Sequence, residues 1–204
     1  IFPDLHVLRV VDSTEDIYDM VINEALMSIF GTAADPNGNG VIEEPVEDQY
    51  IEIVNASGDY VNLAGWQLEA YAEENRTGAE LVHTFPQPSI VPPNGAILIF
   101  GGGDAQAMAD SGLYGDAVIQ VANEGGNGVN LPDYEEGIVP LLTPFGYVED
   151  SIFFDNDIAD QSMSVTRNPD VEGAFEALHF DVSTAFELFS PGRKLDGSAF
   201  EGNG

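Results

Sequence analysis

Oxygen-bearing side chains alternate with proline and glycine in the stretch DPNGNG, residues 35–40. Asp35, Asn37 and Asn39 supply carboxylate and amide oxygens, and Gly40 lets the chain bend sharply beside them. In calcium-binding loops, ligands recur at the first, third and fifth positions, glycine takes the sixth, and a backbone carbonyl takes the seventh. This spacing therefore predicts a Ca²⁺ site.

The remaining ligands of this predicted site follow in the next eight residues. The carbonyl of Val41 falls at the seventh position and Glu43 at the ninth. The twelfth position is Val46, where the pattern requires a bidentate glutamate, so we expect Asp48 to complete the site, with Glu47 as the second choice. The alternative is a solvated turn of Asn, Asp and Gly, which is common between strands.

The segments beside the loop indicate a β scaffold. Residues 49–54 form a β-branched and aromatic run, which predicts a strand, and the apolar run before the loop is too short to indicate a helix. Strand-like runs recur about every ten residues, with Gly, Pro and Asn between them, as in a β-sandwich. The predicted fold is therefore all-β, with one short helix over residues 104–112.

Individual strands are predicted from their hydrophobic patterns. Residues 50–54 and 60–63, separated by NASGD, predict a hairpin, and the alternation over 66–71 predicts a half-buried antiparallel strand. The continuous apolar run at 96–100 indicates a central strand. Further strands are expected at residues 81–85, 117–121, 138–142, 147–154, 163–167 and 175–180.

The composition is strongly acidic. Thirty-six Asp and Glu against five Lys and Arg give a net charge of −31, which repels phosphate backbones and anionic lipid and argues against nucleic-acid binding. Such an excess is tolerated most easily where salt or divalent cations are abundant, so we expect an extracellular or cell-surface location. There is no cysteine to form a disulfide, and bound calcium can take that stabilising role. No stretch is long enough to predict a membrane span.

The sequence gives no support for catalysis. His6, His83 and His179 are the only histidines, and none lies in a two-histidine metal motif or beside a serine in a nucleophile elbow. We expect His83 to form a hydrogen bond at a sheet edge and His179 to lie in a strand. Trp66 is expected in the sandwich core, with stacking on a sugar as the alternative. We therefore predict a protein that is not an enzyme.

The first twenty residues differ from the rest and form a predicted N-terminal extension, ahead of a sandwich at 21–204. Residues 1–11 have the pattern of a strand and 12–16 form an acidic linker. Such a strand can pair with an open sheet edge of the next molecule, and head-to-tail pairing of that kind produces a filament. The alternatives are that it folds back on its own sheet or belongs to a preceding domain. Because the chain opens on Ile1 rather than Met, we expect a cleaved leader or an excerpt of a secreted protein.

Several stretches together resemble the lamin tail domain family in its bacterial and archaeal secreted form. The resemblance covers about residues 20–197 and rests on the following stretches: residues 21–24 (VINE), the DPNGNG loop, 48–54 (DQYIEIV), 61–68 (VNLAGWQL), 83–86 (HTFP), 93–103 and 189–197 (FSPGRKLDG). It implies an immunoglobulin-like β-sandwich on a secreted or surface protein, often beside hydrolases, that serves adhesion or binding. The acidic residue closing the calcium loop is shifted by one relative to the family pattern, and residues 1–20 lie outside the resemblance.

The function predicted from the sequence is a secreted, calcium-binding structural or interaction module that self-associates into an extracellular filament by exchange of its N-terminal strand. The alternative is an accessory domain of a larger secreted hydrolase that binds a carbohydrate, such as a cell-surface glycan, or another surface.

Overall fold

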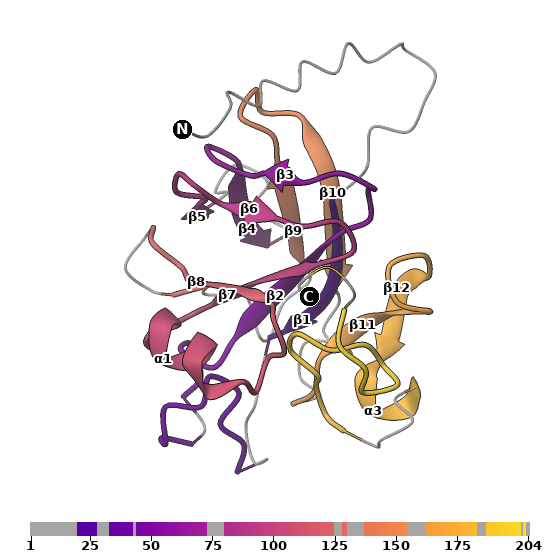
Figure 1. The fold of residues 1–204 in the computed structure, drawn as a ribbon. Helices are drawn as coiled ribbons and strands as arrows, with labels where there is room; N and C mark the ends of the chain where they lie inside the picture. The colour runs from indigo at the N-terminus through magenta and orange to yellow at the C-terminus, as the bar shows by residue number, and fades with distance from the viewer. Residues whose placement is uncertain are drawn as a thin grey trace.

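In the computed structural model of the chain, the residues that can be described are 20–27, 33–42, 44–72, 80–124, 128–129, 137–154, 162–182, 187–200 and 202. Figure 1 shows packed β-sheets with a short helix, α1, at one end. The elements in chain order are β1 (Met20–Leu26), β2 (Tyr50–Asn55), β3 (Val61–Asn62), β4 (Gln67–Ala72), β5 (Glu80–Thr84), β6 (Ile90–Val91), β7 (Ala96–Phe100), α1 (Ala105–Ser111), β8 (Val118–Val121), β9 (Gly137–Leu142), β10 (Val148–Phe154), β11 (Val165–Asn168), β12 (Ala174–Leu178) and α3 (His179–Val182).

The strands form two main sheets. The larger is six-stranded in the order β12-β11-β1-β2-β7-β8, the smaller is four-stranded in the order β10-β9-β4-β5, and β3 pairs with β6 beside them. Neighbours are antiparallel except β7 and β8, which run parallel. The prediction of an all-β sandwich is confirmed, and the strand at residues 96–100 lies inside the larger sheet, as its uninterrupted apolar run indicated.

The core lies between the two sheets because alternate residues of each strand point inward. Ile51 and Ile53 of β2 pack in one cluster with Leu68 of β4 and Leu141 of β9. Trp66 is partly buried against the same cluster, which confirms the prediction that its side chain serves the core. Each fully buried side chain of this size contributes about 1.5–3 kcal/mol relative to an exposed one.

The outer face of the six-stranded sheet is also covered. Tyr50 and Phe100 point away from the main core and form a second buried cluster with Met108 and Tyr114. Met108 belongs to α1, the helix predicted from the sequence, which begins after its N-cap Asp104, whose side chain accepts hydrogen bonds from the backbone amides of the first turn. β2 is therefore buried on both faces.

Two predictions about individual elements are wrong. β2 does not form a hairpin with β3, because both edges of β2 are occupied by β1 and β7, and the turn after Asn55 carries the chain away to pair β3 with β6. His179 does not lie in a strand. β12 ends at Leu178, since its partner in β11 is Val165, the first residue of that strand, and the backbone then turns into α3.

Candidate metal centre and a buried carboxyl cluster

The DPNGNG loop curls around its own side-chain oxygens. Gly38 and Gly40 adopt positive φ values of 68° and 88°, which glycine accepts without steric cost. The Asp35 carboxylate accepts hydrogen bonds from the amides of Asn39 at 3.1 Å and Gly40 at 2.7 Å. The Asn37 side-chain oxygen accepts from the Asn39 amide at 3.0 Å. The side chains predicted as ligands therefore lie on the inside of one bend.

Asp48 joins the loop from the far side of the turn, as predicted. Its carboxylate accepts the amide of Asn37 at 3.3 Å and that of Glu44 at 2.8 Å, and its side chain is buried. Burial raises the pKa of Asp48 to about 6, opposed by these two amides and reinforced by the nearby charges of Asp35 and Glu44. Glu47, the second choice, is exposed.

The other predicted ligands are placed less closely. Val41 is exposed and its amide donates to the Asn39 side-chain oxygen at 2.7 Å, whereas Glu43 lies outside the described residues. Glu44, which the sequence analysis missed, takes part in the loop: its carboxylate accepts from the Asn39 side-chain amide at 2.5 Å. Its position in the sequence, four residues before Asp48, could have indicated this role. The Asp48 amide donates to the Glu44 carbonyl, and this turn brings the two carboxyl groups together.

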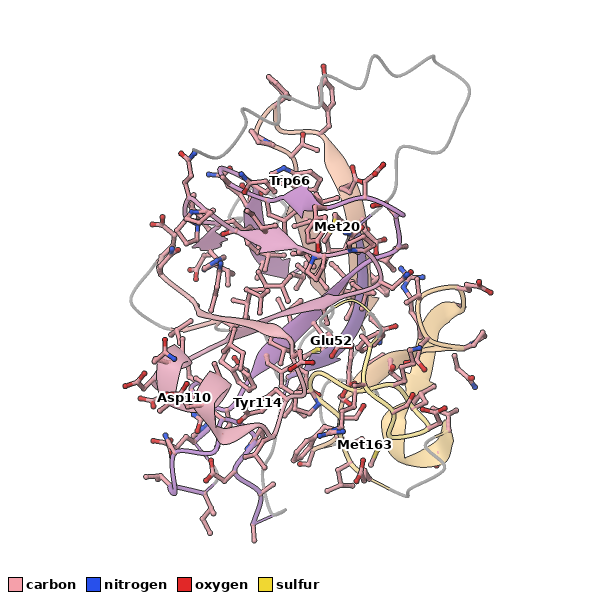
Figure 2. All side chains as sticks on the ribbon, in the orientation of Figure 1. Met20, Glu52, Trp66, Asp110, Tyr114 and Met163 are labelled. Atoms are coloured by element: carbon pink, nitrogen blue, oxygen red, sulfur yellow. The ribbon has the colours of Figure 1, made fainter. Side chains whose placement is uncertain are left out.

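The loop is fixed to the body of the protein by Tyr114, which Figure 2 shows beside α1. The Tyr114 hydroxyl donates to the Pro36 carbonyl at 2.8 Å, and its pKa is raised by burial and by the charges of Asp35 and Asp48. The Asn37 side chain is buried, and its amide nitrogen has no hydrogen-bond partner among the described residues. The position of the loop therefore depends on Tyr114, in the buried apolar cluster with Tyr50 and Phe100, as well as on the loop sequence.

The donor set suits a hard cation. Carboxylate and amide oxygens are the ligands that Ca²⁺ prefers, and a carboxylate oxygen that accepts one amide keeps a further lone pair. Across the described residues, no three carboxylate, imidazole or thiol groups converge on a single metal position. A cation in this loop must therefore also use the oxygens of Asn37 and Asn39 and backbone carbonyls.

A second polar cluster, which the sequence analysis did not predict, lies on the outer face of the six-stranded sheet. Glu24 of β1 and Glu52 of β2 are directly opposite each other across the two strands, and 1% and 0% of their surfaces are exposed. The register of β1 shifts between Ile22 and Glu24, and this bulge puts Asn23 within reach of Glu52: its side-chain amide donates to the carboxyl group at 2.9 Å. No local pattern marks two acidic residues for burial.

Glu24 is surrounded by hydrogen-bond donors. Its carboxylate accepts from the Ser164 hydroxyl at 2.6 Å, from the Ser190 amide and hydroxyl at 2.9 Å each, and from the Tyr50 hydroxyl. Four hydrogen-bond donors therefore converge on one buried carboxyl group. Burial, and then the charge of Glu24, raise the pKa of Glu52 well above its ordinary value.

Outside both clusters, His83 occupies the edge strand β5 and is buried. Its Nε2 lies 2.7 Å from the Gln120 side-chain oxygen on β8, which confirms the predicted hydrogen bond at a sheet edge. Gln120 in turn donates to the Ser89 hydroxyl at 2.8 Å. Burial lowers the pKa of His83, which favours the neutral imidazole. This chain of hydrogen bonds connects the two sheets.

The comparison with known families agrees with this architecture. The family model described as Lamin Tail Domain matches residues 29–145, which include the loop, α1 and the strands from β2 to β9. The chain belongs to the lamin tail domain family, and its fold is the immunoglobulin-like β-sandwich that the resemblance implied. No curated protein matches the chain.

Proposed function

We propose that the protein is a calcium-binding, non-catalytic structural or interaction module that works outside the cell. The observation that carries the proposal is the convergence of four side chains in one loop: Asp35, Asn37, Asn39 and Asp48. The Tyr114 hydroxyl fixes this loop to the buried apolar cluster that contains Tyr50 and Phe100. Bound Ca²⁺ would supply positive charge to these oxygens, and the chain itself supplies the bend, the ligands and the buried anchor.

The electrostatics of the loop support a cation. Asp35 and Glu44 both raise the pKa of Asp48, so the three carboxyl groups repel one another when all are ionised. A divalent cation removes that repulsion, and the net charge of −31 attracts cations to the whole molecule.

Among the described residues, no helix has the length and apolar character needed to cross a membrane.

Calorimetric titration with Ca²⁺ after removal of metal tests the proposal. Wild-type protein is expected to release or absorb heat with saturation at one site per chain, and Asp48→Asn to lose at least about tenfold in affinity because a ligand charge is gone. Asp59→Asn is the matched control, because Asp59 is exposed outside the loop and its hydrogen bonds to described residues are formed by its backbone atoms. Equal affinities for Asp48→Asn and wild type would contradict the proposed ligand set.

Exposed aromatic residues favour the alternative of a surface- or carbohydrate-binding module. Phe145 and Tyr147, in the turn between β9 and β10, are 85% and 72% exposed. Aromatic side chains displayed in this way mark interaction sites and can stack on sugar rings. A glycan array with wild type and the double variant Phe145→Ala/Tyr147→Ala checks this reading, and binding that survives the double substitution excludes this turn as the site.

Self-association remains part of the proposal through the N-terminal extension, of which residues 1–19 lie outside the described residues. Strand donation requires an open sheet edge, and β8 is the last strand at one side of the six-stranded sheet. Deletion of residues 1–16 is expected to reduce the mass measured by light scattering to that of a monomer. An unchanged mass would exclude strand donation.

A further inference from the structure

The segment of residues 187–200, here called the C-terminal segment, is held on the sandwich by carboxyl groups through its backbone amides. The Ser190 amide donates to Glu24 at 2.9 Å, the Gly192 amide to Glu52 at 2.7 Å, and the Leu195 amide to Asp170 at 3.1 Å. Figure 2 shows Glu52 at the centre of the molecule, close to this part of the ribbon. The contacts explain the position of the SPGRKL sequence, which lies beyond the part matched by the family model.

The fit of the segment over Glu52 is tight. Gly192 has a positive φ of 78°, and a Cβ atom at this position would lie 2.2 Å from the backbone oxygen of Tyr114. A side chain there would be excluded by both the backbone conformation and the contact. The segment therefore approaches the sheet closely enough to leave Glu52 with no exposed surface.

The partners of Glu52 are neutral. In the described part of the chain it accepts from the Asn23 side chain and the Gly192 amide, while the acidic Glu24 and Asp170 lie nearby. The basic residues of the segment have other contacts: Arg193 donates to the Leu113 and Gly197 carbonyls, and Lys194 lies 5.8 Å from the centre of the Phe200 ring.

The other charged groups of the surroundings are also engaged elsewhere. Arg167 forms an ion pair with Asp150 at 3.0 Å, and Asp196 accepts hydrogen bonds from Ser198. Tyr50 donates to Glu24, and its own pKa is raised well above the ordinary value by burial and by Glu24. A negative charge on Glu52 is therefore met by two amides and by repulsion from Glu24 and Asp170.

We propose that the C-terminal segment is a proton-dependent cover: it stays on the sheet while Glu52 holds a proton and lifts when Glu52 ionises. An ionised Glu52 needs water or a cation, and the segment that seals it is the element whose departure admits water. The proton passes to solvent, and the amides of Ser190, Gly192 and Leu195 exchange their carboxyl acceptors for water. Opening uncovers Glu52 on the outer face of β2 as a new surface, while Tyr50 stays packed against Phe100 and Tyr114. The inference is independent of the proposed calcium site.

Hydrogen–deuterium exchange of the full chain between pH 6 and pH 9, in saturating Ca²⁺ and corrected for the intrinsic exchange rate, tests the cover. Protection of residues 187–200 is expected to fall by up to about tenfold per pH unit while Glu52 is protonated with the segment closed, as for one linked proton, and to level off above the raised pKa of Glu52, while β7 stays protected. Glu52→Gln keeps the group neutral and should make the profile flat. Glu172→Gln removes the same charge at an exposed position and should give the wild-type profile.

Two results would overturn the proposal: wild-type protection of the segment that does not change with pH, or a Glu52→Gln profile that equals that of wild type. If the variant does not fold, the ¹³C chemical shift of the Glu52 carboxyl carbon in wild-type protein decides the matter. A carboxyl shift that titrates above the ordinary value of 4.5, at the pH where the loss of protection levels off, supports the proposal, and a shift that titrates at the ordinary value contradicts it.

Discussion

The calcium loop and the buried carboxyl cluster gather the same chemical group in opposite surroundings. In the loop, Asp35 is half-buried and Asp48 is buried beneath the bend, and both accept amides from their own turn. In the buried cluster, Glu24 and Glu52 lie between the sheet and the C-terminal segment, and the donors from that segment are more than a hundred positions away in sequence. A cation from solvent can neutralise the excess negative charge of the loop, whereas the cluster is closed to solvent.

This difference shows two ways in which an acidic protein accommodates carboxyl groups that lie close together. Near the surface, repulsion among carboxylates favours binding of a divalent cation. In the interior, the same repulsion adds to desolvation and favours retention of a proton on one member. Calcium should therefore act on the loop alone and pH above neutrality on the cluster alone, and the variants below separate the two.

The largest effect is expected from removal of Glu24. Glu24→Ala leaves the Tyr50, Ser164 and Ser190 donors without their shared acceptor inside the protein, at a loss of about 3–5 kcal/mol in the free energy of unfolding. Urea denaturation with calcium present measures it. Glu172→Ala, on the exposed turn nearby, should stay within about 0.5 kcal/mol of wild type.

Calcium should stabilise the loop and not depend on the cluster. At a free concentration about a hundred times the dissociation constant, Ca²⁺ should raise the free energy of unfolding by about 2.7 kcal/mol. Thermal or urea denaturation with calcium and with a chelator gives the difference, which Asp48→Asn should remove and Glu52→Gln should preserve. Loss of the calcium effect in Glu52→Gln would show that the two regions are not independent.

The pH dependence of stability should distinguish the cluster. The folded-state pKa of Glu52 is raised above its ordinary value of 4.5, so its stabilising contribution is complete below that value and is lost as pH rises through the folded-state pKa. The free energy of unfolding should therefore fall by up to about 1.4 kcal/mol per pH unit from pH 4.5 up to the folded-state pKa of Glu52, and level off beyond it. Urea denaturation across this range should give a flatter curve for Glu52→Gln, and equal slopes would contradict the assignment.

The smallest effect is expected at a carboxylate that is neither buried nor crowded. Asp104 caps α1 by accepting the amides of Gln106 and Ala107 at 3.0 and 3.1 Å. Asp104→Ala should lower the free energy of unfolding by about 1 kcal/mol, with no change in calcium affinity or in the pH profile. Asp116→Ala, an exposed residue outside the helix, is the control for urea denaturation. If Asp104→Ala lowered the free energy of unfolding more than Glu24→Ala, the expected order of the two effects would be wrong.

The sequence predicted local features well. Alternation and apolar runs revealed most strands, and the helix after the triple glycine followed from the helical propensity of residues 104–112. The spacing of Asp35, Asn37 and Asn39 was enough to expect their side chains in one bend, because a short loop places neighbours in sequence close in space, and their role as calcium ligands stays a prediction. Asp48 was chosen over Glu47, and the structure brings Asp48 to the loop.

Contacts distant in sequence could not be predicted. Glu24 and Glu52 look like any two strand carboxylates, and nothing near them indicates that residues 187–200 return to cover them. The hairpin expected after Asn55 failed for the same reason, since a turn signal shows where the chain reverses and not which sheet it joins. The β1 bulge at Asn23 depends on pairing with β2 and leaves no local pattern.

The most direct test of the calcium assignment is an experimental electron-density map from crystals grown with CaCl₂, with anomalous scattering recorded at long wavelength. The account predicts one anomalous peak in the loop, about 2.3–2.6 Å from oxygens of Asp35, Asn37, Asn39 and Asp48. A map without such a peak, in which these oxygens still accept only the amides of their own turn, would contradict it.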